Sequence, residues 1–123
     1  MNLSSNVNLF LGIHAQLKIF HWQTKVFARH EAFASTRDAL EGLMDDFVEE
    51  AMGQYGRFVL DDETKTIQLA NLSELKAVEM ADTICNALVQ ITEQLDSKDT
   101  NLLNIRDEML GKFQKLKYLL TLE

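Results

Sequence analysis

The segment NVNLFLGIHAQLKIFHWQT, residues 6–24, decides the fold of this chain. Its apolar and neutral positions recur at alternating steps of three and four, which places them along one stripe of an α-helix. The helix is expected to begin near Ser4 or Ser5, because serine is a favoured N-cap. A stripe of this kind has to pack against another element. Its members are Val7, Phe10, His14, Leu17, His21 and Thr24.

Three further segments repeat this periodicity, so we expect four helices in a single all-α domain covering residues 1–123. The expected bounds are roughly 5–27, 31–55, 72–96 and 100–121. Proline is absent and only five glycines are present, which leaves long helices uninterrupted. Short turns join the first helix to the second and the third to the fourth. Each of these pairs is therefore predicted to be an antiparallel hairpin of a four-helix bundle.

Local signals mark the expected ends of these helices. Gly53 and Gly56 together mark the expected end of the second helix, since glycine is the usual residue just past a helix end. Asn71 and Glu74 have the spacing of a capping box before the third helix. Asp99 or Thr100 is expected to cap the fourth.

The connection over residues 57–70 is longer than the two turns, and its sequence allows two interpretations. It could form a small β-hairpin. It could also cross the bundle in extended form, because fourteen residues reach roughly 46 Å whereas a 25-residue helix is roughly 38 Å long. A crossover would make the second and third helices parallel.

The composition argues against several classes of protein. Cys85 is the only cysteine, so we expect no internal disulfide, a packed apolar side chain and a reducing compartment such as the cytoplasm. No run of about eighteen apolar residues is present, so no membrane span is expected. Twelve Lys and Arg against nineteen Asp and Glu give a net charge of -7 without a compensating basic run, so no DNA binding is expected.

A few polar residues stand where they could carry chemistry. His14 and His21 lie on the core stripe of the first helix, where hydrogen-bonded core or interface histidines are the simpler interpretation. Asp45 and Glu49 are four apart on the second helix, so their carboxylates could converge on one hard cation. A di-iron centre within one chain needs Glu-x-x-His on two helices, and this sequence has none.

The order of these residues points to a family. His21 and Trp22 stand near the end of the first helix, His30 opens the second, and Asp45 and Glu49 follow His30 by fifteen and nineteen positions. This pattern resembles the Dps-type mini-ferritins. The resemblance implies a ferritin-like four-helix bundle with a long crossover between helices two and three. It also implies that the protein binds iron and oxidises Fe(II), as a ferroxidase does.

The resemblance further implies a homodimer through helices one and two, or a larger cage, with the metal site shared between subunits. One chain would supply two imidazoles and its twofold mate two carboxylates, with no catalytic residue beyond these ligands: His21, His30, Asp45 and Glu49. Trp22 and His14 are expected beside them. The family often has a further Asp ligand where this chain has Ala34, and His14 is the candidate to replace that ligand. Zinc or manganese could substitute for iron on such ligands.

The runs 103–108 and 118–122 are similar to small uncharacterised ferritin-like proteins of tailed phages. This similarity implies an alternative function, a non-enzymatic accessory or assembly protein that keeps the bundle without a working metal site. The expected location is the host cytoplasm, or the virion.

Overall fold

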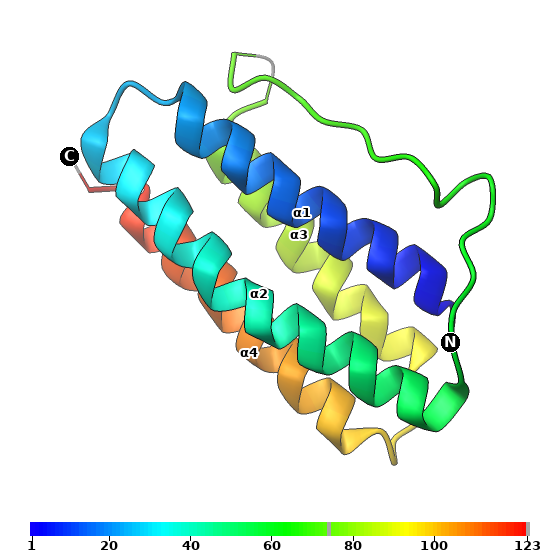
Figure 1. Cartoon of the computed structure of the whole chain (residues 1–123). Coiled ribbons are helices and arrows are strands. Elements are labelled where there is room, and N and C mark those ends of the chain that lie inside the picture. Colours follow the sequence, from blue (N-terminus) through cyan, green and yellow to red (C-terminus); the bar gives the residue numbers. More distant parts are fainter. Residues whose placement is uncertain (74, 123) are drawn as a thin grey trace.

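The computed structural model describes residues 1–73 and 75–122, and within them the chain forms four α-helices, one short 3-10 helix and no strand. Figure 1 shows the four α-helices side by side. The predicted all-α class with four helices is therefore confirmed. The elements are α1 (Leu3–Gln23), α2 (Phe27–Tyr55), α3 (Ala77–Gln90), η1 (Ile91–Gln94) and α4 (Thr100–Leu119).

The helices pack in a continuous order, α1 against α2, α2 against α4, and α4 against α3. The pairs α1–α2 and α3–α4 are antiparallel hairpins with short turns (Figure 1). The connection from α2 to α3 returns the chain to the end of the bundle where α2 begins, so α2 and α3 run in the same direction (Figure 1).

Large apolar side chains fill the space between the helices. Phe10 of α1 meets Phe47 of α2 edge to face with ring centroids 5.2 Å apart. Phe20 and Phe33 form a second aromatic contact at 5.7 Å, nearer the turn. Aromatic pairs in these geometries stabilise a core beyond the burial of their area. Cys85 packs half-buried against this core, and burial raises the pKa of its thiol, as expected for an apolar cysteine.

The α1–α2 turn lies earlier in the chain than the predicted bounds 5–27 and 31–55. Helix α1 ends at Gln23 and α2 begins at Phe27, so the turn is Thr24 to Val26. Thr24 is extended, and its hydroxyl accepts a hydrogen bond from the backbone N–H of Val26. This local bond competes with the helical ladder and ends it there. His30 consequently lies inside the first turns of α2.

The third helix is shorter than the predicted 72–96. It begins at Ala77. The side chain of Gln23 accepts a hydrogen bond from Leu72 N–H and donates one to Asn71 Oδ1, which keeps these two residues in the connection and outside the helix. The other half of the expected capping box, Glu74, lies outside the described residues.

At its C-terminal end α3 tightens into η1 after Gln90. The guanidinium of Arg106 donates hydrogen bonds to the carbonyls of Leu88 (3.3 Å) and Val89 (3.4 Å) at this helix end, and to the Thr92 hydroxyl. Carbonyls at a helix end need partners of this kind.

Amide side chains of α1 hold the extended connection along the bundle. Asn8 donates to the carbonyls of Thr64 and Thr66 at 3.1 and 2.7 Å. Buried Gln16 donates to the carbonyl of Ala70 and accepts from its N–H, both at 2.8 Å. With Gln23 at the far end, these amides lie about two helical turns apart. They supply partners for a backbone that forms no sheet within the described residues.

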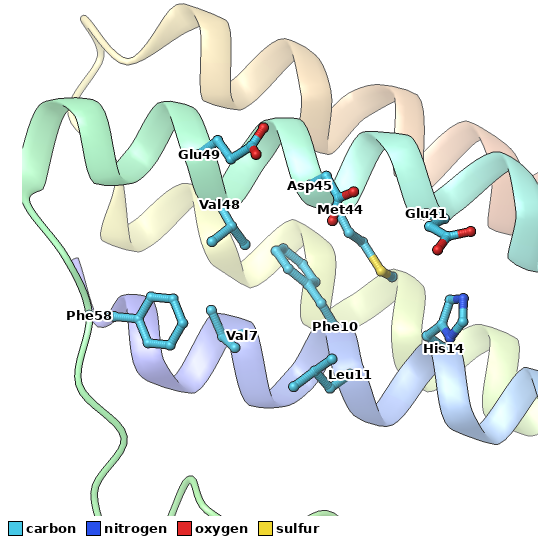
Figure 2. A pocket seen from close by; sticks show the side chains of 10 residues that line it. All are labelled: Val7, Phe10, Leu11, His14, Glu41, Met44, Asp45, Val48, Glu49 and Phe58. Carbon is cyan, nitrogen blue, oxygen red and sulfur yellow. The ribbon is translucent and has the colours of Figure 1, made fainter.

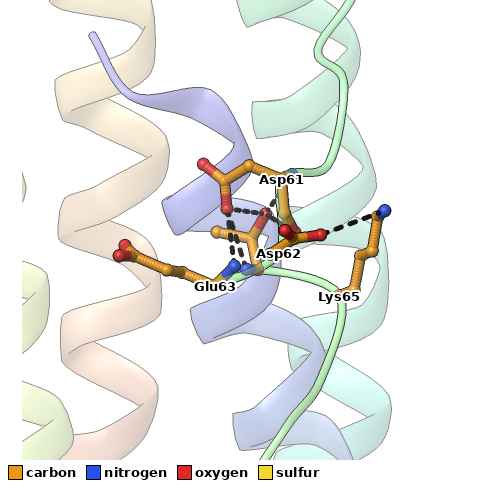
Figure 3. A network of polar contacts seen from close by, with 5 residues as sticks. Asp61, Asp62, Glu63 and Lys65 are labelled. Atoms are coloured by element: carbon orange, nitrogen blue, oxygen red, sulfur yellow. Dashed lines mark hydrogen bonds and ion pairs between the residues drawn. The ribbon is translucent and has the colours of Figure 1, made fainter.

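A tight turn interrupts the connection before it reaches Ala70. Asp61 Oδ1 accepts hydrogen bonds from the N–H groups of Glu63 and Thr64 and from the Thr64 hydroxyl, all at 3.0 Å. Lys65 pairs with Asp62 at 3.5 Å across the outside of the turn (Figure 3). The carboxylate of Asp61 therefore serves the turn, as aspartate commonly does.

Asp99 precedes α4 at the predicted cap position, but its side chain does not cap the helix. The carboxylate is fully buried, and its Oδ2 accepts from the Tyr55 hydroxyl at the end of α2 and from Asp96 N–H at 3.0 Å. The Tyr55 hydrogen bond lowers the pKa of Asp99, and the same contact raises the pKa of Tyr55 to about 12. Asp99 thus ties the α3–α4 turn to the end of α2.

We predict that Gln16→Ala lowers the free energy of unfolding by about 1–3 kcal/mol, because it leaves both polar groups of Ala70 without their buried partner. Gln68→Ala, an exposed glutamine of the same connection, should change it by less than about 0.5 kcal/mol. Urea unfolding of both variants measures the difference. Equal effects would mean that the connection is held by other contacts.

We predict that Asp99→Asn destabilises the protein near neutral pH and that its deficit shrinks as pH falls. A carboxyl whose folded-state pKa lies below its ordinary 3.8 contributes stability above that value and loses it as pH falls through the folded-state pKa. Urea unfolding of both proteins from about pH 7 down to about pH 3 measures this. A deficit independent of pH would show that the charge of Asp99 is not what stabilises the turn.

Candidate functional site

The two predicted imidazole ligands lie together at the turn end of the α1–α2 hairpin. His21 occupies the last turn of α1 and His30 the first turns of α2. Their rings stack with centroids 3.8 Å apart and planes inclined by 19°. The early turn at Thr24 to Val26 is what brings the two residues to the same level.

The two histidines are joined by a reciprocal pair of hydrogen bonds. His21 Nδ1 lies 2.8 Å from the carbonyl oxygen of His30, and His30 Nδ1 lies 2.7 Å from the carbonyl oxygen of His21. A carbonyl oxygen only accepts, so both Nδ1 atoms carry the proton. Each neutral imidazole then presents an unprotonated Nε2, and neither Nε2 has a hydrogen-bond partner within residues 1–73 and 75–122. We call this arrangement the histidine clasp.

The clasp has the form that metal-binding histidines take. A ligating imidazole usually donates its other N–H to a carbonyl or carboxylate, which fixes the tautomer and the ring orientation. Here the backbone supplies both acceptors. His21 and His30 therefore each keep one ring nitrogen that is free to accept a hydrogen bond or to bind a ligand.

The predicted carboxylate ligands lie further along the same hairpin, in a groove between α1 and α2. The groove has a volume of about 400 Å³. Figure 2 shows Glu41, Asp45 and Glu49 spaced along its α2 side, and His14 on α1 across from Glu41. Its apolar lining residues are Val7, Phe10, Leu11, Met44, Val48 and Phe58.

One chain does not bring the four predicted ligands together. His30 and Asp45 are fifteen residues apart on α2, about 22 Å along its axis. Nowhere in the described part of the chain do three His, Cys, Asp or Glu side chains lie close enough to hold a metal ion. A site made of all four residues would need a second copy, as the sequence-based expectation states.

The remaining predicted residues take different positions. Trp22 is exposed, with Lys18 Nζ 5.2 Å from its ring centroid. Asp38, another acidic residue of α2, is exposed and paired with Arg37 at 3.1 Å. Ala34 is half-buried on the same side of α2 as Asp45, which is eleven residues further on or about three turns.

Sequence reasoning missed two features of this face. The histidine clasp depends on a turn three residues long, and the predicted bounds placed that turn too late. Phe27 was not singled out, yet it is exposed and its ring lies 6.2 Å from that of His30. An aromatic residue next to a turn carries no signal that separates a core position from a surface one.

Across the described residues, no helix combines the length and the apolar character that a bilayer crossing demands.

Comparison with known proteins relates the chain to phage. Residues 21–120 match the family described as "Family of unknown function (DUF5856)". An "Uncharacterized 14.6 kDa protein in mobD-ri intergenic region" of Enterobacteria phage T4 is 28% identical over 117 residues, which cover 95% of this chain and 86% of the phage protein. No solved structure matches the chain. The predicted relation to a phage protein is supported, and the resemblance to mini-ferritins stays a prediction.

We predict that both clasp histidines are Nδ1–H tautomers when neutral, because each Nδ1 donates to a carbonyl. Long-range proton–nitrogen correlation spectra at about pH 8, where histidine is neutral, distinguish the two ring nitrogens directly. His14, which has no such carbonyl contact among the described residues, serves as the internal comparison. An Nε2–H signal from His21 or His30 would contradict the clasp.

Proposed function

We propose that this chain, which belongs to the family of unknown function DUF5856, is a ferritin-like protein that binds iron and oxidises Fe(II) between two copies of itself. The copies would pair through α1 and α2. One would supply the histidine clasp and the other Asp45 and Glu49. Zinc or manganese would bind the same ligands without being oxidised by this route.

The observation that carries the proposal is the pair of free Nε2 atoms. Two imidazoles at a helix turn could equally have been held through Nε2, which would have left no nitrogen for a metal. Both are instead held through Nδ1 by backbone carbonyls. Imidazole nitrogen together with carboxylate oxygen suits Fe(II), Zn(II) and Mn(II).

The carboxylates favour a twofold arrangement. Asp45 and Glu49 are one helical turn apart and both line the groove. An antiparallel pairing of two α2 helices sets the start of one beside the later part of the other. The clasp of one copy would then meet the carboxylates of its mate, and the twofold axis would generate the site twice.

The chemistry needs an oxidant from solution. Each Fe(II) ion, as substrate, gives up one electron. Dioxygen takes up two electrons and two protons and leaves as hydrogen peroxide, so two Fe(II) ions are oxidised for each dioxygen. Mixed nitrogen and oxygen ligands with a coordination position left open are what such a reaction requires.

The arrangement of the helices supports the fold half of the proposal. Ferritin-like bundles have one long crossover connection. In this chain α2 and α3 are parallel and the connection between them follows α1 (Figure 1). This agreement concerns topology, and the metal chemistry rests on the clasp.

The phage relative favours a second candidate function. A protein from phage T4 matches nearly the whole chain, so the molecule could act as a non-enzymatic accessory or assembly protein. In that case the clasp would serve the α1–α2 turn alone, and the acidic face of α2 would be a solvated surface.

We predict that replacing His21 and His30 together by Asn abolishes tight Fe(II) binding without unfolding the hairpin. The Asn amide can still donate to the opposite carbonyl in place of Nδ1–H, but it has no counterpart of Nε2. Anaerobic calorimetric titration should show at least a tenfold weaker affinity, about the effect of disturbing a ligand shell. Glu49→Gln should weaken binding similarly, and oxidation in air should slow in both.

The matched control is Asp46→Asn, which changes an exposed carboxylate next to Asp45. It should leave iron binding within about twofold of the starting protein, in keeping with small effects at unrelated surface positions. Equal and weak titration by all four proteins would reject the metal site and leave the accessory function standing.

A further inference from the structure

Two aromatic side chains stand in solvent at the turn end of the α1–α2 hairpin. Trp22 is 63% exposed and Phe27 is 76% exposed. Exposed residues of this size contribute little to the fold of their own chain, and clustered apolar surface often marks an interaction site. We call Trp22 and Phe27 the aromatic tip.

The groove lies on the same outward face as the aromatic tip. Phe27 and Asp45 are eighteen residues apart, about five whole turns, so they lie on one line of α2. Leu11 and Trp22 are eleven residues apart, about three turns of α1. Leu11 lines the groove and is 57% exposed. One face of the hairpin therefore carries the aromatic tip at one end and the groove, shown in Figure 2, at the other.

A single twofold axis relates the two ends. The axis that brings His30 to Asp45 and Glu49 crosses α2 near Asp38, midway between them. Helices α1 and α2 contact each other where Phe10 meets Phe47 and where His21 meets His30.

We infer that the groove is filled by the aromatic tip of a second copy of this chain. In this pairing Phe27 of one copy would lie against Val48 and Glu49 of the other, and Trp22 would lie against the exposed Leu11. The inference rests on the proposed function, because the pairing of His30 with Asp45 and Glu49 places the axis, but the contact itself contains no metal. Each copy gives its tip and receives one, so the contact closes as a dimer.

Charge favours the same pairing. Lys18 and Lys25 are exposed on either side of Trp22, and Lys18 lies over its ring. The groove that would receive this end carries three carboxylates, Glu41, Asp45 and Glu49. A cationic tip entering an acidic groove is complementary, and such complementarity fixes register and excludes parallel pairing of the hairpins.

The area is appropriate for a stable contact. A buried Trp or Phe covers roughly 150–250 Å², so two copies would cover four such side chains together with the matching groove surfaces. Stable interfaces bury about 1,200–2,000 Å² in total. The aromatic tips would also shield the clasp of one copy and the carboxylates of the other from bulk water.

Trp22 is the only tryptophan of the chain, so its fluorescence reports the contact directly. We predict that its emission shifts to shorter wavelength as protein concentration rises, in step with the increase in mass measured by light scattering. The experiment uses the full chain in chelator, so that metal plays no part.

Leu11→Asp tests the groove, and its matched control is Val89→Asp, since Val89 is 51% exposed on α3. Leu11→Asp should raise the dissociation constant of the dimer at least about 30-fold, the effect of losing one strong interface residue. Trp22→Ser should weaken the dimer similarly, and Val89→Asp should leave it unchanged. Circular dichroism checks that each variant is folded.

A dimer in which Trp22 keeps the emission of a solvent-exposed residue would overturn this inference. The metal proposal would then still be decided by the Fe(II) titration. A dimer with Trp22 buried and no affinity for Fe(II) would support the docking and reject the metal site. A chain that stays monomeric at all concentrations would overturn both.

Discussion

The register of α1 against α2 is the constraint on which the rest of this structure depends. It is fixed at one end by the edge-to-face contact of Phe10 with Phe47 and at the other by the histidine clasp. Between these contacts both helices contribute buried apolar side chains to the core. The register decides which side chains remain outside, and these form the groove and the aromatic tip.

The extended connection is the second demand on the fold. An extended segment outside a sheet leaves backbone groups that need partners. Helix α1 supplies them with amide side chains, which can donate and accept at the same time. Gln16 does both with Ala70. Asp99 has a similar role at the opposite end of the bundle, where its buried carboxylate collects hydrogen bonds from Tyr55 and Asp96. Polar side chains thus position the segments that the apolar core does not reach.

The functional proposals differ in how much of this architecture they use. A metal site would give a purpose to the Nδ1 bonding of both imidazoles and to carboxylates that make no helix-to-helix contact of their own. An accessory protein of a phage would need neither, because the clasp would then serve the α1–α2 turn and the acidic residues would be solvated. Both proposals concern the same outward face of the α1–α2 hairpin, and they differ in whether a second copy and a metal ion are needed there.

The sequence by itself determined the helical class and the approximate positions of four helices, because apolar periodicity and the absence of proline act locally. It also determined that Asp45 and Glu49 share a face of α2. The tertiary structure alone decided which nitrogen of each histidine faces outward. It likewise decided that α3 begins at Ala77, since Gln23 of a distant helix holds Leu72. These outcomes depend on hydrogen bonds between residues far apart in the chain or across a turn, and no local pattern records such bonds.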